Sequence, residues 1–166
     1  MDLKMQFLVL ASEKSVGGHE RLFLIRLMKA REEQVRLRAL EVVGLRGERG
    51  AFPSLKRHLE HLVQTRANNE EIETCAASMA KINPSGALEM SEAWLKPKGM
   101  FARLGREDGL KKRAAIASLE YIKDKRAGEI LAQTVKGKEQ VLIDHARAVM
   151  SRRRQRLRGQ EAIVSA

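Results

Sequence analysis

The sequence predicts an all-α protein, an α-solenoid of about four helical hairpins plus a closing helix. Three observations support this prediction. Within residues 35–43 the apolar side chains recur with the 3.6-residue period of a helix. The segment that contains them recurs further along the chain, at offsets of 36 and then 40 residues, a spacing typical of stacked hairpins. Aromatic residues make up only 4% of the chain, so the core must be aliphatic.

The repeat becomes visible when the chain is aligned with itself. Residues 39–50 match residues 75–86 and 115–126. In this register the equivalent positions are small (Ala39, Cys75, Ala115), large and apolar (Val43, Met79, Leu119), and alanine at the start of each second helix (Ala51, Ala87, Ala127). Residues 6–17 align more loosely. That alignment places Leu22 in register with Leu55. The second helix of this hairpin, residues 19–30, is expected to bury Leu22, Phe23, Ile25 and Leu27.

The repeated pattern is a small residue, a large apolar residue, a glycine-containing turn, and a second helix that opens with Ala-Phe-Pro-Ser-Leu in its clearest copy, residues 51–55. It resembles the HEAT-repeat family, especially the short bacterial repeats, and the resemblance covers nearly the whole chain. The resemblance implies that the second helices line a concave surface on which extended partners bind. It says little about activity, because one fold hosts many functions.

The expected domain spans residues 1–158, with hairpins at about 1–30, 31–65, 69–96 and 109–136 and a closing helix at 138–158. The first helix is more apolar than a terminal repeat that faces water. We therefore expect either that the chain is part of a longer protein or that this helix docks on another domain or subunit, as in a homo-oligomer. Residues 159–166 are expected to fray after Gly159.

Local signals place the turns between these helices. Gly44, Gly47 and Gly50 are interpreted as the breaks between the two helices of the second hairpin. Asn68, with Glu71 three residues later, predicts a capping box at the start of the third hairpin. Residues 97–109 then interrupt the repeat with three glycines and one proline. A connection of that length is often functional.

The net charge is +11, and most of the excess lies in two segments. Residues 96–113 carry seven basic and two acidic side chains, and residues 145–166 carry six arginines and one glutamate. Such clusters could contact phosphates or an acidic protein surface. The candidate residues are Lys98, Arg103, Arg106, Lys111, Lys112, Arg113, Arg152, Arg153, Arg154, Arg156 and Arg158.

A second set of candidates follows from the resemblance to HEAT repeats. If the second helices line a concave surface, a partner protein would contact Arg26, Lys29, Lys56, Arg57, Trp94 and Phe101, with the insertion at the rim. Trp94 has two interpretations. It either packs against Met100 or Phe101, or it serves as a partly exposed anchor for the partner.

Other reactive residue types suggest no chemistry. His58 and His61 lie three apart on one helix, but further metal ligands are absent, so they are interpreted as part of a solvated face. Cys75 occupies a repeat position that is alanine elsewhere, which indicates a small core residue rather than a nucleophile. We therefore expect no enzyme, no metal and no cofactor. The single cysteine suggests a reducing, cytoplasmic location, and no apolar run is long enough for a membrane span.

Two functions of different classes remain open. The leading one is a non-enzymatic protein-interaction scaffold that binds an acidic or amphipathic segment, or another domain of the same protein. The alternative is nucleic-acid binding through the phosphate backbone, by the basic insertion and the arginine-rich closing helix. Aromatic side chains that would stack on bases are scarce, so recognition of base sequence is not expected.

Overall fold

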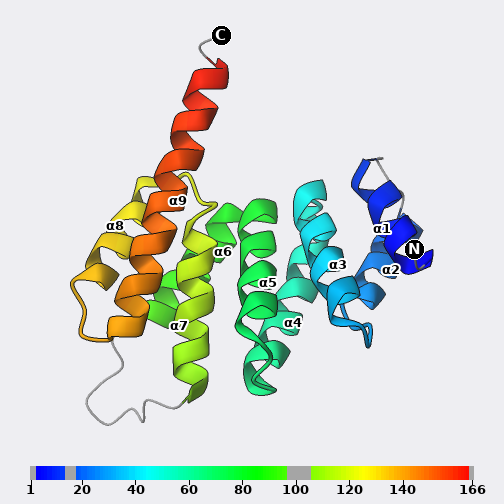
Figure 1. The fold of residues 1–166 in the computed structure, drawn as a ribbon, viewed down its shortest axis with the longest axis horizontal. Coiled ribbons are helices and arrows are strands. Elements are labelled where there is room, and N and C mark those ends of the chain that lie inside the picture. The colour runs from blue at the N-terminus through cyan, green and yellow to red at the C-terminus, as the bar shows by residue number, and fades with distance from the viewer. Residues whose placement is uncertain (1–2, 14–17, 97–105, 165–166) are drawn as a thin grey trace.

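The computed structural model describes residues 3–13, 18–96 and 106–164, and within these ranges the chain is helical without strands. The helices are α1 (Leu3–Glu13), α2 (Gly18–Leu27), α3 (Glu33–Arg46), α4 (Phe52–Gln64), α5 (Asn69–Ile82), α6 (Pro84–Leu95), α7 (Arg106–Leu119), α8 (Lys125–Val135) and α9 (Gln140–Val164), with a short 3₁₀ helix, Arg49–Ala51, before α4 (Figure 1). The predicted all-α class is confirmed. Among the described residues, no helix is both long and apolar enough to cross a membrane.

The odd-numbered helices lie side by side in one layer. In this layer α3 packs between α1 and α5, and α7 packs between α5 and α9 (Figure 1). Each even-numbered helix packs on the odd-numbered helix that follows it, so that α2 contacts α3, α4 contacts α5, α6 contacts α7 and α8 contacts α9. The chain thus advances in one direction from α1 to α9, and each helix contacts mainly its neighbours.

The repeat register identified the core correctly. All nine aligned positions are buried, with Val43 the most exposed at 3% (Ala39, Val43, Ala51, Cys75, Met79, Ala87, Ala115, Leu119, Ala127). All of these side chains except Ala115 belong to two apolar clusters, one centred on α1–α5 and the other on α6–α9. Because burying aliphatic surface supplies most of the folding free energy, the periodic positions are the ones that hold the helices together.

The turn of the second hairpin differs from the prediction. Gly44 lies inside α3 and is buried against α5, where an added Cβ would lie 2.6 Å from the Ser78 Oγ atom. Its role is therefore close helix packing rather than a break. The break is at Gly47, which ends α3 in the left-handed conformation with φ of 64°. Glycine suits that position because it has no Cβ to clash with the backbone.

The prediction for α2 is wrong for Leu22 and Phe23. Leu22 and Phe23 are 55% and 41% exposed. Leu27 is buried as predicted, and Ile25 is partly buried. Leu24 of α2 and Met28 just after it are also buried, so the apolar stripe is rotated relative to that of α4. The Phe23 ring meets Phe7 of α1 edge-on, with the ring centroids 4.7 Å apart.

Two predicted boundaries also shift. Helix α7 begins at Arg106, inside the predicted insertion, of which residues 97–105 lie outside the described part of the chain. Helix α9 continues through Gly159 to Val164, so the predicted helix end was placed too early. Gly159 does not adopt a positive φ, and a single glycine costs a helix only about 1 kcal/mol relative to alanine. The good helix formers that follow it offset that cost.

Candidate functional site

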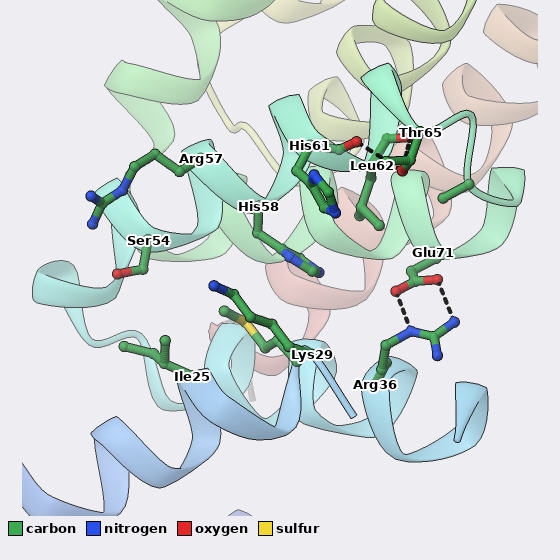
Figure 2. Close-up of a pocket in the computed structure, with 12 residues that line it drawn as sticks. Ile25, Lys29, Arg36, Ser54, Arg57, His58, His61, Leu62, Thr65 and Glu71 are labelled. Atoms are coloured by element: carbon green, nitrogen blue, oxygen red, sulfur yellow. Dashed lines mark hydrogen bonds and ion pairs between the residues drawn. The ribbon is translucent and has the colours of Figure 1, made fainter. Parts of the chain in front are cut away.

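A cleft of about 660 Å³ lies where the end of α2 meets α3, α4 and the start of α5 (Figure 2). Its apolar lining comes from Ile25, Met28 and Leu62, and its polar lining includes two histidines and several charged side chains. Glu71 is the one acidic residue in the lining of the cleft, so the lysine, arginine and histidine side chains outnumber the carboxylates.

An ion pair forms one wall of the cleft. The Arg36 guanidinium donates to both carboxylate oxygens of Glu71, at 2.7 and 3.0 Å, and also to the backbone carbonyls of Ala30 and Arg31 (Figure 2). The hydrogen bonds to Glu71 raise the pKa of Arg36. Glu71 is 2% exposed, and its backbone N–H donates to the Asn68 side chain at 2.8 Å. The predicted Asn68 cap is therefore confirmed, although the Glu71 carboxylate binds Arg36 instead of completing a capping box.

His58 lies between this wall and the end of α2. His58 is 6% exposed, and both of its ring nitrogens are buried with no hydrogen-bond partner in the described part of the chain. Burial lowers the pKa of His58, and the opposing effect of Glu71 is smaller. The imidazole is therefore neutral at pH 7. A buried polar group without a partner is costly, which makes His58 a candidate functional residue.

The sequence interpretation of His58 as part of a solvated face is wrong. A signal for its burial was present, because Leu55, His58, Leu59 and Leu62 follow the i, i+3, i+4, i+7 pattern of one helix face. The other three side chains of that pattern are buried too. His61, one turn further along, is exposed at the edge of the cleft.

Two of the predicted partner-binding residues come together at this cleft. Lys29, in the turn after α2, and Arg57, on α4, are exposed and line it, and neither makes an ion pair within the described ranges. Arg26 and Lys56 are exposed but do not line the cleft. Trp94 is half-buried and packs against the first apolar cluster. Phe101 lies outside the described residues.

The arginines of α9 are held by their own chain. Arg152 and Arg156 donate to the two carboxylate oxygens of Glu120, at 2.7 and 2.9 Å, and Glu120 is 6% exposed. Arg156 also lies over the Tyr121 ring, 4.2 Å from its centroid. Arg153 donates to the backbone carbonyls of residues 122–124. We call Arg152, Arg153 and Arg156 the tail cluster. The tail cluster holds α9 against the residues that follow α7.

The other residues that were predicted to contact phosphate differ in whether they already form ion pairs. Lys112 pairs with Asp108 and Glu139, and Arg113 pairs with Glu73. Lys111, Arg154 and Arg158 make no ion pair among the described residues. Lys98, Arg103 and the side chain of Arg106 lie outside the described part.

Other reactive residue types are accounted for by packing. Cys75 is fully buried with its Sγ atom 3.6 Å from the Leu55 carbonyl oxygen, and burial raises the pKa of its thiol. Across the described ranges, no group of three or more His, Cys, Asp or Glu side chains is placed to hold a metal ion.

A scan against protein-family models, a search of curated proteins and a search of solved structures each gave no match. The function must therefore be inferred from the geometry of the chain itself.

Proposed function

We propose that this chain is a non-enzymatic, HEAT-like interaction module that binds an acidic, amphipathic segment of a partner protein. The observation that carries the proposal is the cleft between α2 and α4, where the exposed cations Lys29 and Arg57 flank a buried histidine that has no partner. The apolar lining from Ile25, Met28 and Leu62 fits the other face of such a segment.

Charge complementarity indicates that the partner segment is negatively charged. Glu71 already receives two hydrogen bonds from Arg36, so its charge is neutralised within the wall. The charges of Lys29 and Arg57 are not compensated in this way. A segment with acidic side chains would pair with them, and like charge would exclude basic segments.

The helix arrangement supports the HEAT-like part of the proposal. Odd-numbered helices follow one another in one layer, and each even-numbered helix packs on the odd-numbered helix that follows it (Figure 1). Residues in equivalent repeat positions are buried in three successive copies. In a HEAT-like stack the second helices line the binding surface. The cleft lies beside α2 and α4, which are the second helices of their hairpins.

Nucleic-acid binding is the second candidate and has weaker support. A phosphate-binding surface needs basic side chains that can exchange counterions for phosphates. The three arginines of the tail cluster already bind Glu120 and backbone carbonyls. Arg154 and Arg158 are exposed on α9 and remain the best contacts for this function in the described residues.

The proposal is tested by fluorescence polarisation with a labelled short peptide in which Glu alternates with Leu, compared with the same peptide carrying Gln for Glu. The cleft variant is Lys29→Gln with Arg57→Gln. Its control is Lys123→Gln with Lys136→Gln, two exposed lysines that do not line the cleft, so net charge is matched. We expect the cleft variant to bind the acidic peptide roughly tenfold more weakly, since two exposed ion pairs are lost.

Three results would count against the proposal. They are absence of peptide binding at low salt, equal binding of the Gln peptide, and equal losses in the two double variants. A generic DNA duplex is titrated in parallel against Arg154→Gln with Arg158→Gln. Tight DNA binding that this pair weakens would instead favour the nucleic-acid function.

A further inference from the structure

His58 is the feature of the cleft that a general binding surface does not explain. The buried serine hydroxyl groups have partners: Ser78 donates to the Leu40 carbonyl at 2.7 Å, and Ser91 and Ser118 share a hydrogen bond at 2.7 Å. Both ring nitrogens of His58, in contrast, are buried without a hydrogen bond in the described part of the chain. His58 occupies a position on the apolar face of α4 where a leucine would suit the helix pattern. An imidazole there loses its hydrogen bonds to water and gains none from the described residues.

The surroundings of His58 restrict what could bind it. Lys29 extends across the cleft from His58, and the Arg36–Glu71 pair closes one side (Figure 2). Both oxygens of Glu71 already accept from Arg36, so Glu71 has little to offer a ligand. Lys29 is exposed and makes no ion pair in the described ranges. Its flexible side chain can therefore move to admit a ligand and can then pair with a negative charge.

A neutral imidazole has one N–H donor and one acceptor nitrogen. A ligand that satisfies both must accept one hydrogen bond, donate another, and carry a negative charge for Lys29. An acidic residue within a peptide has all three, because its carboxylate accepts and its backbone N–H donates. A carboxylate between an ammonium group and an N–H donor also makes the stronger, charge-assisted kind of hydrogen bond.

We propose that the cleft is a pocket for a single Asp or Glu residue of the bound segment, whose carboxylate lies between Lys29 and a ring N–H of His58. This inference rests on the proposed function, because it assigns the anchor residue of the acidic segment. His58 then acts as the specificity-determining group, and the cations at the rim attract the segment.

The direct test follows the ¹⁵N resonances of the His58 imidazole in the full chain. The probe is N-acetyl-glutamic acid N-methylamide, a Glu residue between two peptide bonds. Its glutamine counterpart tests the need for charge, and inorganic phosphate tests for a general anion site. We expect a saturable shift of the His58 resonances with the glutamate fragment alone. No shift, or an equal shift with the glutamine fragment or with phosphate, would overturn the assignment.

The second test uses the Glu–Leu peptide and a matched pair of variants. His58→Leu should weaken peptide binding about tenfold, the value of one hydrogen bond to a charged group. His145→Leu is the control, because His145 is partly buried, with its Nε2 atom buried and without a hydrogen bond among the described residues, but lies on α9. Equal losses in the two variants would contradict the pocket.

The two proposals fail in different ways. If the peptide binds the wild type and His58→Leu equally well, the pocket assignment is wrong and the interaction module stands. If the peptide does not bind at all, the proposed function is wrong, and the fragment titration on the wild type still decides whether the pocket accepts a carboxylate. Circular dichroism of both variants confirms that any loss of binding is not a loss of fold.

Discussion

The cleft and the tail cluster are both basic, yet they use their charge differently. The tail belongs to the segment with the densest run of arginines in the sequence, and Arg152, Arg153 and Arg156 are bound to the chain's own oxygens. The cleft presents only two uncompensated cations, Lys29 and Arg57, and both face solvent. The density of charge in a sequence therefore does not measure the charge that is free to meet a partner.

The difference has a local cause. The residues that follow α7 lie beside α9, with a buried carboxylate at Glu120 and with carbonyls at residues 122–124 that can accept hydrogen bonds. Long arginine side chains on α9 satisfy both. At the cleft the corresponding carboxylate is Glu71, and Arg36 alone satisfies it. The remaining cations of the cleft, Lys29 and Arg57, make no ion pair in the described part of the chain.

The largest effect is expected in the tail cluster. Arg152→Met with Arg156→Met would remove both ion pairs of the buried Glu120 carboxylate, and we expect the free energy of unfolding to fall by about 2–3 kcal/mol. Arg154→Met with Arg158→Met removes the same charge from exposed positions and should change it by less than about 0.5 kcal/mol. Urea denaturation measures both. Similar changes in the free energy of unfolding for the two double variants would contradict the structural role of the tail cluster and its difference from the cleft.

The next effect has the opposite sign. His58→Leu should raise the free energy of unfolding by about 1 kcal/mol, because an apolar side chain replaces a buried polar group without partners. Stability gained together with binding lost is the expected mark of a residue retained for function. Thermal and urea unfolding measure the change. A loss of stability would show that the imidazole has a bonding role in the folded protein.

The pH dependence involves His58 in the cleft and His145 on α9. Burial lowers the pKa of His58 and of His145 below the ordinary value of 6.5. As the pH falls through 6.5, the unfolded chain takes up protons that the folded chain does not, so stability is complete above this pH and is lost below it. We expect a lower melting temperature at about pH 5.5 than at about pH 7.5, and a smaller decrease in His58→Leu. If the melting temperature of His58→Leu falls as much as that of the wild type, a group other than His58 is responsible for the pH dependence.

The smallest effect is expected at the cleft rim. Lys29→Met with Arg57→Met should alter the free energy of unfolding by less than about 0.5 kcal/mol, because neither side chain contributes an ion pair to the fold in the described residues. Urea denaturation of this variant beside the tail double variant gives the comparison directly. A loss as large as that of Arg152→Met with Arg156→Met would mean that the rim cations are structural as well.

The sequence predicted the core better than the site, for a physical reason. Ala39, Cys75 and Ala115 are buried because the helical period repeats, and a period can be read from one sequence. The burial of His58 could have been inferred in the same way, because His58 lies on the apolar face of α4. Its lack of a partner could not, because that depends on Arg36 of another helix having already engaged Glu71. The engagement of Arg152 likewise depends on which helix end lies beside α9.

The position of α5 has a consequence for the timescales of local opening. This helix contacts α3, α4, α6 and α7, so its amide protons can exchange with solvent only when several neighbours separate, and it should be the last to take up deuterium. Helix α2 contacts mainly α3 and should exchange early. The cleft joins the end of α2 to α4 and α5. Occupation of the cleft should therefore delay deuterium uptake in α2 while leaving that of α8 unchanged.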